Sequence, residues 1–144
     1  MLFPNKFKIP GLILLIAGTV LAILYFSINL RFELPVFAVV SSFMETKLFT
    51  TFSTNFADEL TMILLFSGLF ILAMSGERDE NVQVRAARQK AVKTTLIINS
   101  AILAFAILFI YGSGFMAIIV MNLFLPFIIY LIFFNLAKRK IMKT

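Results

Sequence analysis

The chain has 144 residues, of which 61% are hydrophobic, and carries a formal net charge of +6. An ordinary soluble domain is about 45–50% apolar, so this composition excludes such a domain and predicts a membrane protein with room for one helix bundle. The chain has no Cys and no His, which excludes disulfides and removes the commonest general base and metal ligand.

Four long apolar stretches predict transmembrane helices, at about residues 9–30, 57–75, 95–111 and 115–135. At about 1.5 Å rise per residue, about 20 helical residues cross the ~30 Å hydrocarbon layer of a bilayer. The first stretch is too long for the apolar core of a signal peptide and precedes no small-residue cleavage site, so we interpret it as a retained span. The expected fold class is an all-α membrane protein, with the whole of 1–144 in one four-helix domain.

Basic side chains are sorted by side if these spans alternate in direction. Eleven of the thirteen Lys and Arg residues precede the first span, follow the fourth, or lie between the second and third: Lys6, Lys8, Arg78, Arg85, Arg88, Lys90, Lys93, Lys138, Arg139, Lys140 and Lys143. Only Arg31 and Lys47 fall in the connection between the first two spans. The positive-inside rule therefore predicts that both termini and the connection at 77–94 are cytoplasmic. Each basic residue near a membrane attracts anionic headgroups by about 1 kcal/mol, so the lipid bilayer is an expected partner of this face.

Two small residues in the first span, Gly18 and Ala22, stand four apart. This spacing lets another helix approach closely, although it is frequent in apolar helices. We interpret the pair as packing inside the same bundle rather than as a dimer contact.

The segment between the first two spans, residues 33–57, has two interpretations. Phe49, Phe52 and Phe56 keep the i, i+3, i+7 spacing of a helix that lies in the membrane interface. The β-forming residues at 36–40 equally favour a short hairpin. Either form is too apolar to stand free in water, so we expect the segment to cover the outer end of the bundle and touch headgroups.

The second span is expected to begin at a helix cap. Asn55 can accept from a free backbone N–H group, and Asp58 and Glu59 complement the positive end of the helix. We interpret this acidic pair as a helix start rather than a site.

The cytoplasmic connection is predicted to be a helix that continues into the third span, as one element from near Asp79 to Tyr111. Its acids come first and its bases later, an order that complements the helix dipole. The acids are Glu77, Asp79 and Glu80. The bases leave a narrow uncharged stripe on this helix, formed by Val84, Ala87 and Ala91.

The third and fourth spans are joined by Gly112-Ser113-Gly114, which is long enough only for a tight helical hairpin. The two helices are therefore expected to be antiparallel neighbours. Pro126 stands in the middle of the fourth span and predicts a kink there.

Two amide side chains, Asn99 and Asn122, lie inside the third and fourth spans. Counting helical rise from the turn places Asn99 about 21 Å and Asn122 about 13 Å deep, so we expect no direct bond between them. Each is expected to bond another helix, a subunit partner or a backbone carbonyl, as structural glue or as the polar lining of a path.

Several classes of site are not supported by the residue types. No acid or base lies inside a predicted span, which argues against a proton- or ion-coupled transporter. The chain has no Ser/His/Asp or Cys/His set, so we expect no enzyme activity, no metal and no cofactor. The basic face is held at the bilayer and has no interleaved aromatic residues, so direct nucleic-acid binding is not expected.

Two short motifs resemble a group of uncharacterised bacterial four-span inner-membrane proteins. Asn55-Phe56-Ala57-Asp58-Glu59 is similar to the N-x-x-D-E stretch that opens their second span. Ser75-Gly76-Glu77-Arg78-Asp79-Glu80, followed by Arg85, is similar to the S-x-E-x-x-D-E stretch with a later Arg that follows that span, except that one residue instead of two separates Glu77 from Asp79. The genomic neighbourhood of such proteins often suggests a small DNA-binding regulator as their partner. The resemblance therefore implies that a cytoplasmic protein docks on a surface formed by Glu77, Asp79, Glu80 and Arg85.

The predicted function is a non-catalytic integral membrane partner or regulatory subunit, which docks a cytoplasmic protein through residues 77–93. The alternative is a small oligomeric channel or transporter lined by Asn99, Asn122 and Ser67. A third hypothesis is a lipid-binding or membrane-organising protein that acts through Phe49, Phe52 and Phe56. A homo-oligomer is compatible with each of these.

Overall fold

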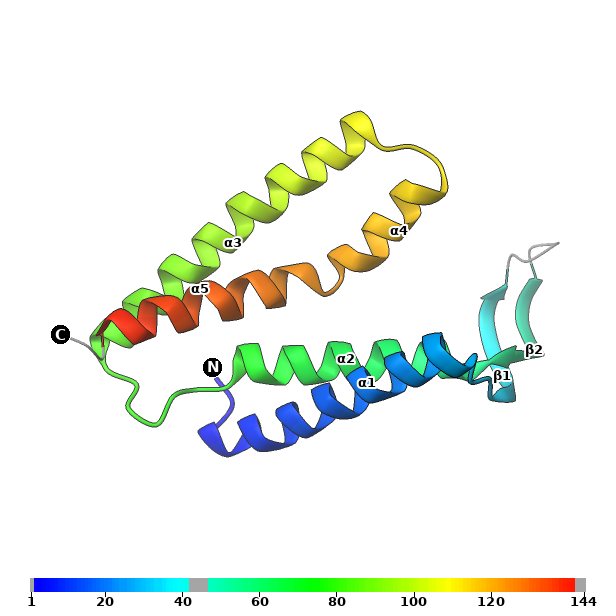
Figure 1. Ribbon diagram of the computed structural model, residues 1–144, viewed down its shortest axis with the longest axis horizontal. Coiled ribbons are helices and arrows are strands. Elements are labelled where there is room, and N and C mark those ends of the chain that lie inside the picture. Colours follow the sequence, from blue (N-terminus) through cyan, green and yellow to red (C-terminus); the bar gives the residue numbers. More distant parts are fainter. Residues whose placement is uncertain (1, 42–46, 142–144) are drawn as a thin grey trace.

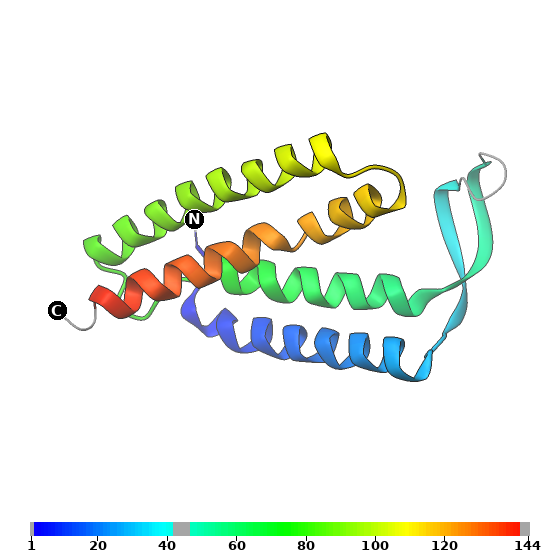
Figure 2. The same ribbon diagram turned by 45° about the horizontal axis from the view of Figure 1, so that its top comes forward.

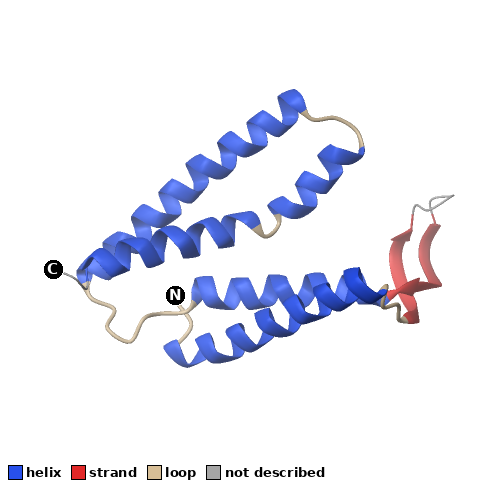
Figure 3. Cartoon of the chain, viewed as in Figure 1, coloured by secondary structure: helices blue, strands red, loops and turns tan. Residues whose placement is uncertain are grey.

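The computed structural model describes residues 2–41 and 47–141, and Lys143 of the basic tail lies outside the described residues. It is mostly helical. After a single 3-10 turn, η1 (Asn5–Phe7), the elements in chain order are α1 (Lys8–Ile28), β1 (Glu33–Ser41), β2 (Lys47–Asn55), α2 (Phe56–Met74), α3 (Val82–Phe109), α4 (Ser113–Asn122) and α5 (Leu125–Ile141). Figure 3 shows the strands confined to one corner of a helical molecule.

The helices form two antiparallel hairpins, one of α1 and α2, the other of α3 with α4 and α5 (Figures 1 and 2). The described parts of both termini and the connection from α2 to α3 lie at one end, called the basic end here. The two strands and the α3–α4 turn lie at the opposite end, called the hairpin end. Phe127 of α5 joins the two hairpins, since its ring lies 5.5 Å from that of Phe66 and 6.1 Å from that of Phe70, both on α2.

The helices have the lengths that a membrane requires. Residues Asn5–Ile28, α2 and α3 are each long and apolar enough to cross a bilayer. α4 and α5 meet the test together, although they are bent by 45° at the break between them. The described residues thus contain three membrane-length helices, or four if the bent pair counts as one span, which confirms the prediction of a helical membrane protein.

Glycines bring α1 and α2 into backbone contact. A Cβ added at Gly68 would lie 2.6 Å from the backbone nitrogen of Leu15, and one added at Gly18 would lie 2.9 Å from that of Leu65. The prediction that Gly18 packs inside the bundle is therefore confirmed. The facing residue Gly68 was not singled out from the sequence.

We expect Gly68→Ala to lower the thermal unfolding midpoint in detergent, because the new methyl group would press on the backbone of α1. Overpacking of this kind costs about 1–3 kcal/mol. Gly114→Ala is the matched control, since its Cβ would meet only the side chain of Ile110 at 3.4 Å. Circular dichroism measures both midpoints, and equal midpoints for the two variants would contradict the packing.

The segment between α1 and α2 is a β-hairpin, the second of the two interpretations of residues 33–57. β1 and β2 pair antiparallel, with Phe37 opposite Thr51 and Val36 opposite Phe52. The helical spacing of the phenylalanines does not decide the structure, because Phe56 begins α2 while the other two lie in β2. The alternation of β-branched and aromatic residues therefore prevails here.

A single side chain fixes the base of this hairpin. Asn55 Oδ1 accepts hydrogen bonds from the N–H groups of Phe32 (2.9 Å) and Ala57 (3.3 Å). Phe56 N also donates to Phe32 O at 2.8 Å. The predicted cap at Asn55 is confirmed, and it also ties the chain that leaves α1 to the start of α2.

α3 begins later than predicted, at Val82 rather than near Asp79, and ends at Phe109. The reason is a better cap, because Asn81 Oδ1 accepts from Val84 N at 2.8 Å. The acids therefore precede the helix instead of forming its first turn. The predicted uncharged stripe is buried, with Val84, Ala87 and Ala91 at 6%, 8% and 3% exposure.

The predicted kink in the fourth span is confirmed. Pro126 lies at the second residue of α5, and the helix breaks at Leu123 and Phe124, where the proline ring would otherwise crowd the carbonyl of Asn122. Leu123 N and Phe124 N donate to carbonyls three residues back, at 3.2 and 3.1 Å. The break thus leaves these two donors satisfied within lipid-facing structure.

Candidate functional site

Arg88 of α3 is the centre of a polar cluster at the basic end. Its Nε donates to Glu80 Oε1 at 3.3 Å and its Nη2 to Glu80 Oε2 at 3.2 Å, the two-point geometry of a guanidinium on a carboxylate. The side chains of Arg88 and Glu80 are only 12% and 18% exposed. This ion pair therefore lies largely out of water, where it is screened less than a surface pair.

Two aromatic residues of α5 complete the environment of this guanidinium. Arg88 Nη1 donates to the hydroxyl of Tyr130 at 2.7 Å, and the guanidinium carbon lies 4.5 Å from the centre of the Phe134 ring. The two rings are stacked, with centroids 5.8 Å apart. A cation over an aromatic ring adds about 0.5–2 kcal/mol, so α5 holds α3 by both charge and ring contact.

Arg88 also reaches the end of α2. Its Nη1 lies 3.5 Å from Ala73 O and its Nη2 3.4 Å from Ser75 O. The last carbonyls of a helix have no partner within the helix and carry the negative end of its dipole. A cation from α3 thus caps α2, so one side chain contacts α2, α5 and the loop before its own helix.

Glu77 forms a second ion cluster beside the first. Its carboxylate accepts from Lys8 of α1 at 2.6 Å and from Lys138 of α5 at 2.7 Å, and its backbone N–H donates to Glu80 Oε2 at 2.9 Å. Burial by itself raises the pKa of the Glu77 carboxyl, but the hydrogen bonds from Lys138 and Lys8 outweigh burial and lower this pKa below its ordinary value. Glu77 is therefore a charged bridge between the first and last helices.

The same end holds the N-terminal segment in place. Phe3 N donates to Met74 O at 2.9 Å, and Gly76 N donates to Phe3 O at 2.8 Å, a short parallel bridge beside Ser75. The ring of Phe3 meets that of Phe70 edge-on at 6.3 Å. The segment before α1 therefore packs on the end of α2.

The predicted docking residues divide into two groups. Glu77 and Glu80 are half-buried in ion pairs within the chain, so the expectation that all four side chains are exposed is wrong for these two. Asp79 and Arg85 are exposed. The difference arises because α3 begins late, so that the three acids lie in a loop. In this loop Glu77 and Glu80 point toward the helices, and Asp79 between them points away.

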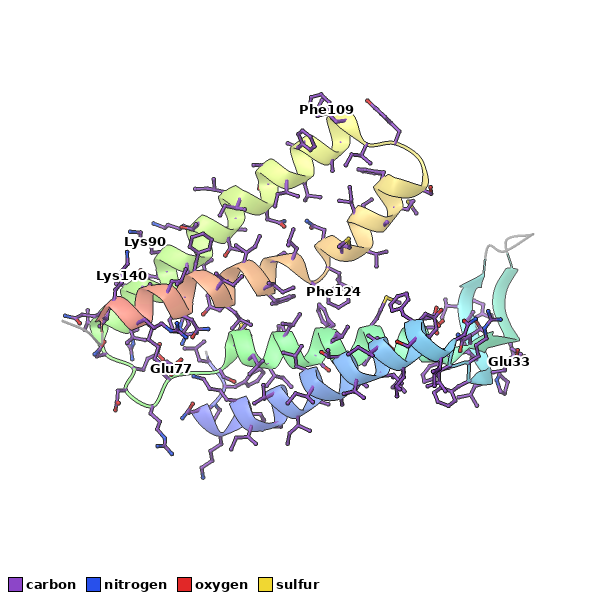
Figure 4. All side chains as sticks on the ribbon, in the orientation of Figure 1. Glu33, Glu77, Lys90, Phe109, Phe124 and Lys140 are labelled. Atoms are coloured by element: carbon purple, nitrogen blue, oxygen red, sulfur yellow. The ribbon has the colours of Figure 1, made fainter. Side chains whose placement is uncertain are left out.

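A cleft of about 450 Å³ opens beside these ion pairs. It lies between the 3-10 turn before α1, the loop before α3, and the last turns of α5. Its lining residues are Asn5, Glu77, Arg78, Asp79, Asn81, Gln83, Val84, Lys138 and Ile141. The cleft brings exposed residues of both charges next to a wall that the Glu77 cluster holds in position. Figure 4 shows Glu77, Lys90 and Lys140 at this end and Glu33 at the other.

Asn99 and Asn122 bond each other directly, so the prediction that they do not pair is wrong. Asn122 Nδ2 donates to Asn99 Oδ1 at 2.9 Å, and Asn99 Nδ2 donates to Asn122 Oδ1 at 3.4 Å. The predicted depths assumed that every residue between Asn99 and Ser113 adds about 1.5 Å along the helix axis. α3 instead ends at Phe109, and residues 110–112 cross between the helices, which leaves the two amides each roughly 15 Å from the turn.

Asp58 and Glu59 lie in the first turn of α2, as expected of a helix start. Oδ1 of Asp58 and Oε2 of Glu59 are buried without a hydrogen-bond partner among the described residues. They stand at the hairpin end, whereas Glu77 and Glu80 stand at the basic end. The two motifs of the family resemblance therefore lie at opposite ends of the molecule and do not form one site.

Residues of the polar cluster that the sequence did not single out are Lys8, Tyr130, Phe134 and Lys138. A signal for Arg88 itself was present, because it stands at i+4 from Val84 and three before Ala91, on the face of the uncharged stripe. A basic residue on an otherwise apolar buried stripe requires an acidic or aromatic partner.

The chain matches no family model, no curated protein and no solved structure.

We expect Arg88→Met to destabilise the protein by about 1.5–3 kcal/mol, because it leaves the half-buried carboxylate of Glu80 without its charged donor. Arg85→Met removes the same charge one turn away, from an exposed position, and should change stability by less than about 0.5 kcal/mol. Thermal unfolding in detergent measures both changes. If Glu80→Gln failed to offset part of the Arg88→Met loss, the two side chains would not be coupled.

We expect the Glu77 cluster to lose its contribution to stability in acid. The folded pKa of Glu77 lies below its ordinary value, so this contribution is present above the ordinary pKa of about 4.3 and is lost as the pH falls through the folded pKa. Unfolding midpoints of Glu77→Gln should therefore lie below those of the unaltered protein at pH 7 and approach them at acid pH. Asp79→Asn, the same change at an exposed neighbour, serves as the control. A constant gap across the pH range would contradict the assignment.

Proposed function

We propose that the chain is a non-catalytic integral membrane protein that crosses the bilayer four times, with α4 and α5 as one bent span. Both termini and the loop before α3 are then cytoplasmic. The membrane is the bacterial inner membrane, as the family resemblance implies. The support is that basic residues of three separate segments gather at one end of the structure. Lys90 and Lys140 lie there in Figure 4, and Lys8 and Lys138 both pair with Glu77.

We infer that this protein acts as a partner or regulatory subunit, and that a cytoplasmic protein docks at its basic end. The observation that carries the proposal is the open cleft beside the two ion clusters. In Figures 1 and 2 the first turns of α3 and the last turns of α5 extend beyond the ends of α1 and α2. A partner can therefore reach this cleft above the level of the headgroups.

The docking contacts fall on the exposed side chains, namely Arg78, Asp79, Gln83 and Arg85. Glu77 and Glu80 have a different role in this proposal, since they hold the loop in one shape and so reduce the ordering that binding requires. The surface combines both charges on a fixed backbone, which favours a protein partner of complementary charge over a bulk lipid surface.

The alternative, a channel or transporter lined by Asn99, Asn122 and Ser67, has weaker support. The two amides satisfy each other, and Ser67 Oγ donates to Ile63 O in its own helix at 2.7 Å. Polar groups that are paired in this way serve helix packing and leave less hydrogen-bonding capacity for a permeating solute.

A photo-crosslinking residue placed at Gln83, in the full chain expressed in its native membrane, tests the docking proposal. We expect it to capture a cytoplasmic protein, and the capture to be lost when Asp79→Lys and Arg85→Glu reverse the exposed charges. The same crosslinker at Glu33, at the hairpin end, should capture no cytoplasmic protein. Crosslinks from Gln83 only to a second copy of the chain, or none at all, would count against the proposal.

A further inference from the structure

The β-hairpin has one strongly exposed apolar face. Phe37, Val39 and Phe49 are 61%, 56% and 69% exposed, although each is a large hydrophobic residue. The register places Phe37 opposite Thr51, and successive side chains of a strand alternate, so the three share one face of the ribbon. On the other face, Val36 and Ala38 are half-buried, while Leu34 at the base is 48% exposed.

The two rings on this face contact each other. The centroids of Phe37 and Phe49 are 6.3 Å apart. No charged residue stands at positions 34–40 of β1 or 48–54 of β2. The aromatic pair thus forms the middle of a neutral surface. An apolar surface of this kind on an isolated two-stranded ribbon, which is marginally stable in water at best, needs a covering.

Phe49 is also held in a backbone conformation that phenylalanine seldom adopts. Its φ is 51°, in the left-handed region where glycine or asparagine is usual. Such a conformation costs about 1–3 kcal/mol and persists where the surroundings compensate for it. The strained backbone thus holds the Phe49 ring in its exposed position beside Phe37.

The position of the hairpin indicates what that covering is. The strands run across the direction of α1 and α2 instead of continuing it (Figures 1 and 2). Their base is tied to the first residues of α2 through Asn55 and Phe32, with no linker between strand and helix. In a membrane the ribbon then lies along the outer surface, directly at the level where the apolar surface of the spans ends.

We propose that the face of Phe37, Val39 and Phe49 inserts into the interfacial region of the outer leaflet and anchors the hairpin to lipid. Phenylalanine rings enter the boundary between headgroups and acyl chains, as the apolar face of an interfacial segment does. The covering is continuous with the lipid around α1 and α2. The choice of the outer leaflet rests on the proposed topology, whereas the insertion itself is independent of the proposed docking at the basic end.

The chain has no Trp, so one introduced tryptophan is a reporter without background. Phe37→Trp and Phe49→Trp are prepared in the full chain and reconstituted in vesicles of phosphatidylcholine brominated at shallow or deep acyl positions. Ile23→Trp, 59% exposed on α1, is the lipid control, and Val82→Trp, 83% exposed at the start of α3, is the water control. Excitation at the tryptophan edge avoids the three tyrosines.

We expect both hairpin reporters to show blue-shifted emission and to lose fluorescence mainly in vesicles brominated at the shallow position. Emission and quenching like those of Val82→Trp would overturn the proposal, because the face would then be in water. Blue-shifted emission without quenching would overturn it equally, since a protein or a second copy would then cover the face. Circular dichroism shows whether each variant folds, and two reporters keep the test decisive if one does not.

Discussion

The contact of Arg88 with Glu80, Tyr130 and the end of α2 is the interaction on which the arrangement of the two helical hairpins depends. The ring contacts of Phe127 are not directional, so they would allow α5 to slide along α2. The hydrogen bonds of the Arg88 guanidinium are directional and fix the position of α3 relative to its partners. The end of a helix at a membrane boundary also needs partners for its last carbonyls. Arg88 supplies both needs at once, because it caps α2 from α3 while α5 covers its face.

This contact makes the two ends of the molecule unlike each other. At the basic end, ion pairs, a backbone bridge and stacked rings hold the N-terminal segment, α2, α3 and α5 together. Toward the hairpin end, α3 and α4 diverge from α1 and α2 in Figure 1, and many of their large apolar side chains are exposed. A fixed end suits a docking surface, while an end that depends on its surroundings suits contact with a bilayer.

The sequence was sufficient where the cause is local or periodic. Length and hydropathy predict the membrane-length helices, Pro126 predicts the kink, and Asn55 predicts the cap of α2. The sequence was insufficient where neighbours compete. Both hairpin and helix satisfied the pattern of residues 33–57. The pairing of β1 with β2, and the tie between Asn55 and Phe32 at its base, form the hairpin. The pairing of the two amides depended on a turn whose path no spacing specifies.

The polar cluster could be predicted in part only, because its partners are distant along the chain. Lys138 and Glu77 are separated by 61 positions and Arg88 and Tyr130 by 42. Lys138 and Tyr130 lie in α5, whereas Arg88 lies in α3 and Glu77 in the loop before it. The distribution of basic residues predicts only which side of the membrane Lys138 and Arg88 face. Which acid meets which base depends on the order of the helices around the bundle, and that order follows from Gly68, Phe127 and the buried stripe of α3. Glu77, Asp79 and Glu80 resembled a docking motif because a sequence does not distinguish an exposed carboxylate from one that is paired. Only the placement of the cations across the bundle separates Asp79, which is left to face solvent, from Glu77, which is enclosed between two lysines.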